Sequence, residues 1–464
     1  MPCGQWDQHL SIGEPTHSHL NRCCTTSNSM KSLNKPDLSS AWEALASDYP
    51  TVVEKYPEVG QSMGVGSIDN IANLFRDRYD TIKEILRTQA GFKESGTIKQ
   101  VCREFRNSPF KKKHYNVIGI VADMSRTKSG GKMVTIEDHS GTMRVFIRKE
   151  DPAADSLMLD DVVGLRGKFE EDGKWLWVDE VHYADVLMNH LNRGGEDFDP
   201  ISIAFISDIH VGSKYFLEDT WDKMMSWMNE ADLAKNIKYL VLSGDTVDGV
   251  GIYPGQENNL IIKNAFDQYE FFARKLDALP DHITPIILPG NHDAVRPAEP
   301  QPVLESTIQQ KFNSAIHIGN PCRVNLSGIE VLSYHGKGMD DIIPQMDDVT
   351  YQTSIKGMKH MLKKRHLAPL WGERNSLSAE ETDQMVIQRP PDIFVTGHTH
   401  SHGFEWYRGV PCVVSSTMQG QTDFMNMVGM ASDKGYLTLY NIQNREAKVI
   451  QFHPNDDPFA HANL

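Results

Sequence analysis

The chain is poor in cysteine and has no long hydrophobic run. Its six cysteines among 464 residues are scattered, and no two of them form a C-x-x-C pair. Sparse, scattered cysteines are typical of a reducing compartment and argue against a disulfide framework. No apolar stretch approaches the roughly 20 residues that a membrane helix needs, so we expect no contact with a membrane. Residues 1–20 lack the apolar centre of a signal peptide.

Positive charge is also scarce. The chain carries 47 lysines and arginines against 62 aspartates and glutamates, which gives a formal net charge of −15. This balance argues against a freestanding protein that binds nucleic acid through bulk charge. It does not exclude a nuclease, because bound metal ions supply positive charge locally.

The sequence does contain five short apolar runs, each followed at once by aspartate, asparagine or histidine. The runs are residues 201–206, 239–242, 283–288, 329–332 and 393–395, and the segments after them read SDIH, SGD, PGNHD, SYHG and TGHTH. Short apolar runs bounded by turn-forming residues are typical of buried strands. In layered α/β folds, ligands bind beyond the carboxyl ends of the strands. We therefore expect the five segments to meet at one shared rim.

The side chains at these strand ends form a coherent set of metal ligands. They are two aspartates, one asparagine and four histidines: Asp208, His210, Asp245, Asn291, His335, His398 and His400. Mixed carboxylate and imidazole shells suit borderline divalent ions such as manganese, iron or zinc. A carboxylate shared by two ions would hold them about 3.5–4 Å apart, which clamps a phosphate and activates a bound water. A lone Asn-His-Asp is more often a surface turn, and only the five-part pattern changes that expectation.

The order D-x-H, G-D, G-N-H-D, H and G-H-x-H resembles that of the calcineurin-like metallophosphoesterases. The resemblance implies two metal sites with one shared carboxylate. The first would be formed by Asp208, His210, Asp245 and His400. The second would be formed by Asp245, Asn291, His335 and His398. His292 matches the family's histidine that contacts the scissile phosphate and assists the leaving group, and it is the one residue with an implied catalytic role. The expected cofactor is a pair of divalent ions, manganese first, with magnesium, zinc, iron or nickel also compatible.

The chain is expected to be a multi-domain α/β protein. Residues 1–66 are polar and are expected to be disordered, apart from a short helix pattern at 41–47. Residues 67–96 hold apolar side chains at helical spacing after Ser67, which could cap the helix. Residues 97–187 contain five strand patterns with glycine turns, which suggests an OB barrel, although the pattern alone fits any small all-β barrel. The remaining expected parts are a linker at 188–200, a two-sheet α/β calcineurin-like phosphoesterase domain at 201–452 and a tail at 453–464.

Two basic stretches each allow two interpretations. The first, residues 111–114, is an ordinary solvated surface or the phosphate-contacting edge of a single-strand binder. Beside it, Phe110, Tyr115 and Phe146 could stack on bases or belong to the core. The second, residues 356–365, has methionine and leucine at helical spacing, which predicts a helix that packs on the core or docks a partner.

Over residues 68–452 the resemblance narrows to the small subunits of euryarchaeal family D DNA polymerases. It rests on GDTVDGVGIYPGQ at 244–256, on LKKRHLAP at 362–369, and on FRDRY at 75–79 followed by the OB and phosphoesterase segments. It implies a 3′–5′ exonuclease that proofreads for a large catalytic polymerase subunit, its partner. The implied substrate is the 3′ end of single-stranded or mismatched DNA, and the implied location is the archaeal cytoplasm, at the nucleoid.

Other interpretations remain open at this stage. Related break-repair nucleases have histidine where this chain has Asp248, so the role of that position cannot be carried over. The accessory subunits of eukaryotic replicative polymerases look similar but have lost the metal ligands, whereas every ligand position is filled here. The alternatives are a phosphatase with the same metal core and a non-catalytic scaffold subunit. An OB domain argues against the first, and intact ligands argue against the second.

Overall fold

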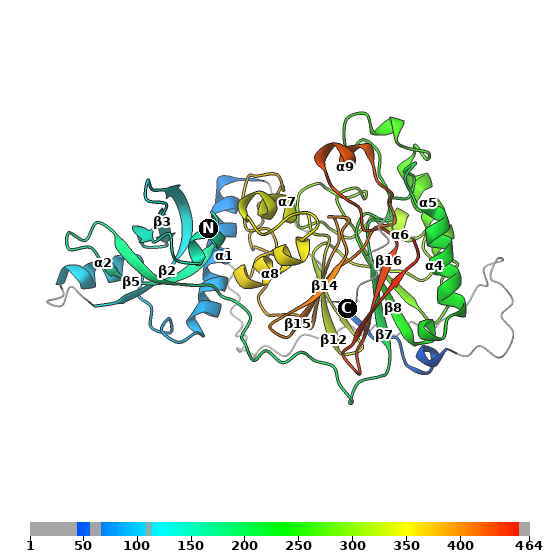
Figure 1. Ribbon diagram of the computed structural model, residues 1–464, viewed down its shortest axis with the longest axis horizontal. Coiled ribbons are helices and arrows are strands. Elements are labelled where there is room, and N and C mark those ends of the chain that lie inside the picture. The colour runs from blue at the N-terminus through cyan, green and yellow to red at the C-terminus, as the bar shows by residue number, and fades with distance from the viewer. Residues whose placement is uncertain (1–43, 56–65, 108–112, 454–464) are drawn as a thin grey trace, which may run out of the picture.

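The structure is a computed structural model that describes residues 44–55, 66–107 and 113–453. The predictions for residues 1–43 and 56–65, for the tail from 454 on, and for Phe110, Lys111 and Lys112 lie outside these residues. The described part is a mixed α/β protein with two six-stranded sheets and a closed five-stranded barrel (Figure 1). No helix in this part is both long and apolar enough to cross a membrane.

The barrel contains all five of the strands predicted for residues 97–187. They are β2 (Tyr115–Arg126), β3 (Lys132–Asp138), β4 (Gly141–Ile147), β5 (Val162–Phe169) and β6 (Leu176–His182). The closed order is β2-β3-β4-β6-β5. Only β4 and β6 pair in parallel, and the other neighbours are antiparallel. Alternate side chains, such as Val134 and Ile136 on β3, are fully buried inside the barrel.

Two helices pack against the barrel, and the sequence predicted only one of them. α1 (Ile68–Arg87) begins after Ser67, whose hydroxyl accepts a hydrogen bond from the N–H of Asn70, so the predicted cap is confirmed. α2 (Ile98–Asn107) was missed, and the expectation of an all-β segment at 97–187 is therefore wrong. Its apolar face is buried against the barrel, with the ring of Phe105 lying 4.5 Å from that of Phe169.

The first sheet has the order β10-β9-β8-β7-β16-β17. Its parallel strands are β7 (Ser202–Ile206), β8 (Ile237–Ser243), β9 (Thr284–Leu288) and β10 (Ile316–His317). β16 (Tyr436–Asn441) and β17 (Ala447–Gln451) continue it as antiparallel strands. Three of the five predicted apolar runs are the strands β7, β8 and β9.

The second sheet has the order β1-β11-β12-β13-β15-β14. Its strands are β1 (Val53–Lys55), β11 (Cys322–Leu326), β12 (Ile329–Tyr334), β13 (Ile393–Thr396), β14 (Gly403–Tyr407) and β15 (Val410–Val414). β12, β13 and β15 are parallel to one another. The remaining two predicted runs, which became β12 and β13, therefore lie in a different sheet from the first three.

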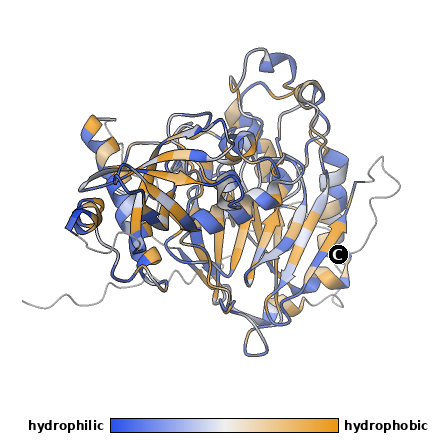
Figure 2. Ribbon diagram, turned by 60° about the vertical axis from the view of Figure 1, so that its left-hand side comes forward, coloured by the Kyte–Doolittle hydropathy of each residue, from blue (hydrophilic) through white to orange (hydrophobic). Residues whose placement is uncertain are grey.

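The two sheets pack face to face, and helices cover their outer faces. The shared core contains Phe205 and Tyr239 of the first sheet and Val331 and Val395 of the second. α4 (Glu218–Glu230) and α5 (Ala265–Leu276) cover the first sheet, and α7 (Met339–Ile342) and α8 (Ser354–Lys364) cover the second. The apolar strands between amphipathic helices are visible in Figure 2. The short helices are η1 (Leu45–Asp48), α3 (Ala153–Ser156), η2 (Asp232–Asn236), η3 (Gln256–Asn258), α6 (Ser306–Gln309), η4 (Ile343–Gln345) and α9 (Asp423–Val428).

Two segments that were expected to be loose make specific contacts instead. In residues 44–55, β1 pairs with β11, and the buried ammonium of Lys238 donates to the carbonyl oxygen of Tyr49 at 2.7 Å. The expectation of disorder is therefore wrong for residues 48–55, whereas the helix pattern at 41–47 overlaps the short helix η1 (Leu45–Asp48). In residues 188–200, Arg193 forms an ion pair with Asp392 at 2.7 Å. This linker is held against the second sheet, because its contacts offset the entropy of a free connection.

Packing accounts for the second basic stretch, residues 356–365. α8 buries Met358, Met361 and Leu362 in the core, which favours the core interpretation over partner docking. At its end, the buried Lys364 pairs with the buried Asp161 of the barrel part. Beside the first basic stretch, residues 111–114, Tyr115 is only 3% exposed. Its ring therefore belongs to the core, and the suggestion that it stacks on a base is wrong.

Candidate metal centre

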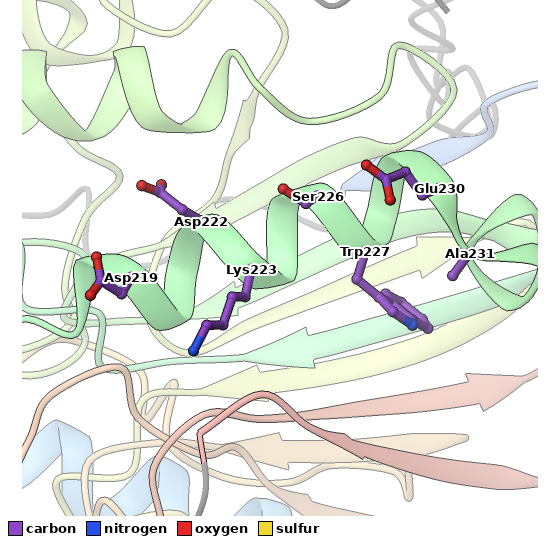
Figure 3. A pocket seen from close by; sticks show the side chains of 7 residues that line it. All are labelled: Asp219, Asp222, Lys223, Ser226, Trp227, Glu230 and Ala231. Atoms are coloured by element: carbon purple, nitrogen blue, oxygen red, sulfur yellow. The ribbon is translucent and has the colours of Figure 1, made fainter.

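The outer face of α4 carries a hollow that does not involve the candidate site. It has a volume of about 700 Å³ and is lined by Asp219, Asp222, Lys223, Ser226, Trp227, Glu230 and Ala231 (Figure 3). None of the seven predicted ligands lines it. Mixed charges along one helix of this kind are an ordinary solvated surface.

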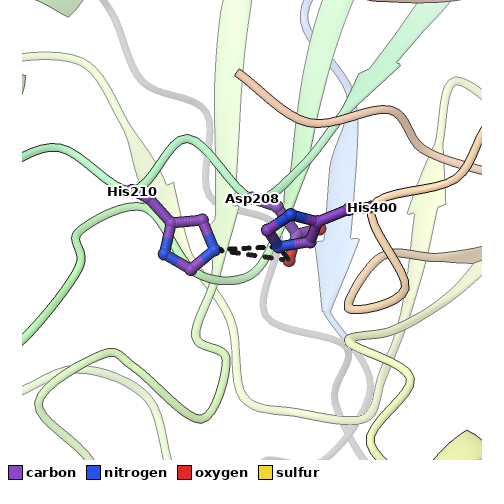
Figure 4. Close-up of side chains that lie close together, drawn as sticks. All are labelled: Asp208, His210 and His400. Atoms are coloured by element: carbon purple, nitrogen blue, oxygen red, sulfur yellow. Dashed lines mark hydrogen bonds and ion pairs between the residues drawn. The ribbon is translucent and has the colours of Figure 1, made fainter. Parts of the chain in front are cut away.

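The five predicted strand ends meet between the two sheets. Asp208, His210 and His400 come from β7 and β13, which belong to different sheets, yet their ligand atoms lie within 4.8 Å of one another (Figure 4). The same holds for Asp208, Asp245 and His335, and for His210, Asp245 and His292. One rim therefore joins both sheets, because the carboxyl ends of their parallel strands face the same side.

The first group surrounds a buried carboxylate oxygen, Asp208 Oδ1. His400 Nε2 lies 3.4 Å from Asp208 Oδ1, and His210 Nε2 lies 3.9 Å from the same atom. The two Nε2 atoms are 3.1 Å apart. Asp208 Oδ2 accepts from Ser207 Oγ at 2.5 Å and from the His398 N–H at 2.9 Å, whereas Oδ1 is buried without a hydrogen bond among the described residues. An orphaned carboxylate oxygen beside two converging ring nitrogens fits a bound cation.

The second group is joined to the first by Asp245. Its Oδ2 lies 3.3 Å from His335 Nε2 and 3.8 Å from His210 Nε2, and so it faces both groups. Its Oδ1 accepts a hydrogen bond from the His292 N–H at 2.8 Å. The side-chain oxygen of Asn291 lies 3.1 Å from His335 Nε2. This arrangement fits a carboxylate that bridges two cations.

His398 is placed differently from the other six. Its ring lies 5.2 Å from that of His335, but its Nε2 contacts Asp340 Oδ1 at 3.0 Å. Only its Nδ1 therefore remains for a cation. Asp340 was not found in the sequence analysis, because an aspartate five residues after His335 has no local pattern that would distinguish it.

Backbone strain is concentrated at the predicted ligands. Asp208, His210, Asp245, His398 and His400 have φ between 51° and 70°, in the left-handed region. This conformation costs a non-glycine residue on the order of 1 kcal/mol, and it persists only where the surroundings enforce it. Five of seven ligands in this region indicate that the site is built for the position of its side chains.

Glycines allow the chain to pass close to the two carboxylates. A Cβ at Gly290 would lie 2.2 Å from Asp245 Oδ1, and a Cβ at Gly397 would lie 2.6 Å from Asp208 Oδ2. Any side chain at either position would displace a carboxylate. This close approach explains the glycine in the G-N-H-D and G-H-x-H segments.

Hydrogen bonds at Nδ1 hold three of the rings in place. His210 Nδ1 lies 3.1 Å from Asp248 Oδ1, His335 Nδ1 lies 2.9 Å from the Ser243 carbonyl oxygen, and His292 Nδ1 lies 2.8 Å from the Asp248 carbonyl oxygen. These acceptors favour a proton on Nδ1 and leave Nε2 free to bind a cation, as in metal sites. Asp248, whose role the sequence left open, thus positions His210.

The buried charges depend strongly on one another. Burial alone would raise the pKa of Asp245, but the charges of His335 and His292 overcome it and hold that pKa well below its usual value. Burial would lower the pKa of His335, yet the Asp245 carboxylate raises it to about 10. Burial lowers the pKa of His400, so that ring is neutral near pH 7. The carboxylates therefore hold a proton on His335, which a divalent ion would have to displace.

Comparisons with known proteins indicate the family to which the chain is related. Residues 203–404 match the family of the B subunits of DNA polymerases alpha and epsilon. The chain is similar to the DNA polymerase II small subunit of Methanocaldococcus jannaschii, with 36% identity over 88% of this chain and 70% of that protein. The protein of that name from Archaeoglobus fulgidus is 36% identical over 82% of this chain and 77% of its own length. The DNA polymerase II small subunit of Halobacterium salinarum is 32% identical over 92% of this chain and 84% of its own length.

Proposed function

This chain belongs to the family of DNA polymerase II small subunits, the small subunits of the euryarchaeal family D DNA polymerase, and from that premise we propose that it is the 3′–5′ exonuclease subunit of the polymerase. Its partner is the large catalytic subunit, which carries out synthesis. The observation that carries the proposal is Asp245, whose Oδ2 faces His210 at 3.8 Å and His335 at 3.3 Å. A scaffold subunit would not need buried, strained, mutually facing ligands, because they lower stability.

The finer fold assignment is part of this proposal. The barrel order β2-β3-β4-β6-β5, with β4 and β6 parallel, supports an OB-fold. The two packed six-stranded sheets between helical layers support a calcineurin-like phosphoesterase domain at 201–452. An OB-fold is a frequent carrier of single-stranded nucleic acid, which favours DNA over a phosphoprotein as the substrate.

Two divalent ions, manganese first, would be held by the residues already described. The first would be bound by Asp208, His210, Asp245 and His400. The second would be bound by Asp245, Asn291, His335 and His398. When bound, such ions supply the positive charge that stabilises a phosphodiester under attack and lower the pKa of a water.

His292 is placed to act on the leaving group. Its Nδ1 contacts the Asp248 carbonyl oxygen at 2.8 Å, and its ring lies 4.7 Å from the ring of His210. With Nδ1 as the donor to that carbonyl, Nε2 can give a proton to the departing 3′ oxygen only when the ring is cationic. Burial lowers the pKa of His292, so the cationic ring gives up its proton more readily than an ordinary imidazolium does.

The test is manganese-dependent digestion of a 5′-labelled primer with a mismatched 3′ end. We expect removal of the 3′ nucleotide by the wild-type chain and a loss of roughly 10²–10⁴-fold in His292→Ala, the usual weight of an acid–base group. A phosphopeptide tested in parallel distinguishes a phosphatase. Full activity in His292→Ala would remove this residue from the mechanism, and an inactive wild-type subunit, alone and with its large subunit, would contradict the proposal.

A further inference from the structure

Two surface segments near the candidate metal centre expose apolar and aromatic side chains. Residues 249–262 expose Tyr253 at 38%, and α9 exposes Phe424 at 61% and Met427 at 76%. Isolated exposed apolar side chains are ordinary, but a group of them beside a site marks a surface that binds something. In Figure 1, α9 stands at the top of the part that contains the two sheets.

Both segments are fixed to the same buried carboxylate. Gln256, which is 1% exposed, donates from Nε2 to the carbonyl oxygen of Asp248 at 2.8 Å and to its Oδ2 at 3.0 Å. Gln419, just before α9, donates from Nε2 to Asp248 Oδ1 at 3.1 Å. Asp248 in turn contacts His210. One exposed ring is therefore carried by a segment that begins next to Asp248, and the other by a segment that begins near Gln419, which contacts Asp248.

A short strip of chain with a positive charge lies between the two segments. The Lys214 N–H donates to the Asn259 carbonyl oxygen at 2.8 Å, which ties the strip to residues 249–262. The Tyr215 hydroxyl donates to Asp423 at 2.8 Å, which ties it to α9. The ammonium of Lys214 remains 41% exposed and lies 3.9 Å from Asp423, too far for a strong pair.

We propose that Tyr253 and Phe424, with Lys214 between the segments that carry them, hold the unpaired bases at the 3′ end of a DNA strand beside the metal centre. These three residues are called the aromatic rim below, and the inference rests on the proposed nuclease function. Aromatic faces stack on any base, and a lysine contacts the phosphates between them, which is the chemistry of a single-strand binder without sequence preference.

The occupant follows from the charge of the chain and from the place of the rim. At a net charge of −15, DNA is not held by bulk attraction, so local stacking has to supply affinity. Bases at a paired end are already stacked within the duplex, whereas bases at a mismatched or single-stranded end are free to stack on the rim. The rim thereby favours the ends that a proofreading nuclease should remove.

The first experiment measures binding of a fluorescent single-stranded oligodeoxynucleotide, protected by 3′ phosphorothioate linkages, to the full-length chain. Tyr253→Leu and Phe424→Leu keep an apolar side chain but remove the ring, and each should weaken binding roughly 5- to 150-fold, the cost of one stacked base. Phe424→Tyr keeps the ring and should bind as the wild type does. The matched control is Trp406→Leu, an exposed aromatic at 44% on the edge strand β14, which should leave binding unchanged.

The second experiment separates the rim from the metal centre. It compares kcat/KM for a single-stranded oligonucleotide with kcat/KM for thymidine 5′-(p-nitrophenyl phosphate), which has no neighbouring base to stack. The ratio of kcat/KM for the oligonucleotide to kcat/KM for the nitrophenyl ester should fall in Tyr253→Leu and Phe424→Leu and stay constant in Trp406→Leu. If the wild type cleaves neither substrate, the nuclease proposal fails and the binding experiment alone decides on the rim.

Three results would overturn the rim. The two leucine variants could bind the oligonucleotide as tightly as the wild type does. Trp406→Leu could weaken binding as much as they do, which would indicate a general effect of surface apolarity. The leucine variants could instead lose assembly with the large subunit while keeping DNA binding, which would make the surface a protein interface. Unchanged thermal unfolding midpoints would show that the variants are folded.

Discussion

Asp248→Asn should weaken the first of the two proposed metal sites and leave the second nearly intact. The Asp248 side chain is buried and accepts three hydrogen bonds: from His210 Nδ1 at 3.1 Å, Gln419 Nε2 at 3.1 Å and Gln256 Nε2 at 3.0 Å. Asparagine has one acceptor oxygen in place of two. In one orientation its NH₂ group would face His210 and Gln419, and in the other it would face Gln256. All three side chains are hydrogen-bond donors, so either orientation places donor against donor.

The size of the effect follows from this geometry. Gln256 cannot turn its oxygen toward the new NH₂ without losing the bond that its Oε1 accepts from the Ile252 N–H at 2.9 Å. Loss of a partner that orients a ligating histidine typically costs 10- to 100-fold in metal affinity, about 1.4–2.7 kcal/mol. Among the predicted ligands, only His210 has a ring that contacts the Asp248 side chain, so the loss should fall on the ion bound with Asp208 and His400.

Asp340→Asn is the matched variant for the other site. Asp340 Oδ1 contacts His398 Nε2 at 3.0 Å, and Lys337 Nζ lies 3.1 Å from Oδ2. This change should weaken the second ion and spare the first. Manganese titration of each full-length variant, by calorimetry or by the manganese resonance signal, gives two binding steps to compare. Equal loss at both steps in either variant, or no loss in both, would refute the division of ligands between the two ions.

Three further predictions concern stability. Arg78→Met should destabilise the chain by about 3–5 kcal/mol, because the buried Asp383 carboxylate loses the guanidinium group that lies 2.6 Å from it and is left with the His366 ring as its side-chain partner. Arg76→Met, at an exposed position on the same helix, is the calorimetric control. Burial and the charge of Lys55 lower the pKa of His317 to about 4. Between pH 6.5 and 4 the unfolded chain therefore binds a proton at this residue that the folded chain does not, and about 3 kcal/mol of stability should be lost over that range. Urea unfolding of His317→Leu should lack this part of the acid sensitivity. A truncation that removes residues 44–55 as well as the preceding ones should unfold at a lower temperature than one that begins at 44, because it removes β1 and the acceptors of Lys238; equal unfolding temperatures would contradict this.

The sequence predicted the strands, and the residues that meet where they end, because both follow from local patterns. An apolar run ended by Ser207 or Gly290 specifies where a strand stops, and the next residue is the ligand itself. The helix α2 was missed for an opposite reason. Its three buried residues are separated by lysine, glutamine and arginine, and in a segment rich in strand patterns they were too few to stand out.

The residues that support the ligands could not be found in this way, because their partners are distant in the sequence. Asp248 meets Gln419, which is 171 residues away, and Arg78 meets Asp383, which is 305 residues away. Hydrogen bonds between residues so far apart produce no short-range pattern in the sequence. The segment FRDRY stands out in the sequence only as a resemblance, and the structure supplies its physical reason. Arg78 is fully buried, and it joins the helix that packs on the barrel to the part that contains the candidate metal centre.

The same network bears on how the barrel and the candidate centre act together. Arg78 also donates to the Pro369 carbonyl oxygen at 2.5 Å, and Asp383 accepts from His366 Nε2 at 2.9 Å, so one buried ion pair joins α1 to the segment that follows α8. The buried pair of Lys364 with Asp161 makes a second connection. Buried pairs gain little net stability over apolar packing but are costly to break singly, so they specify one geometry more than they strengthen it. Under the proposed nuclease function, a DNA strand held on the barrel would then be presented to the candidate metal centre at a fixed distance, which a freely jointed pair of domains could not provide.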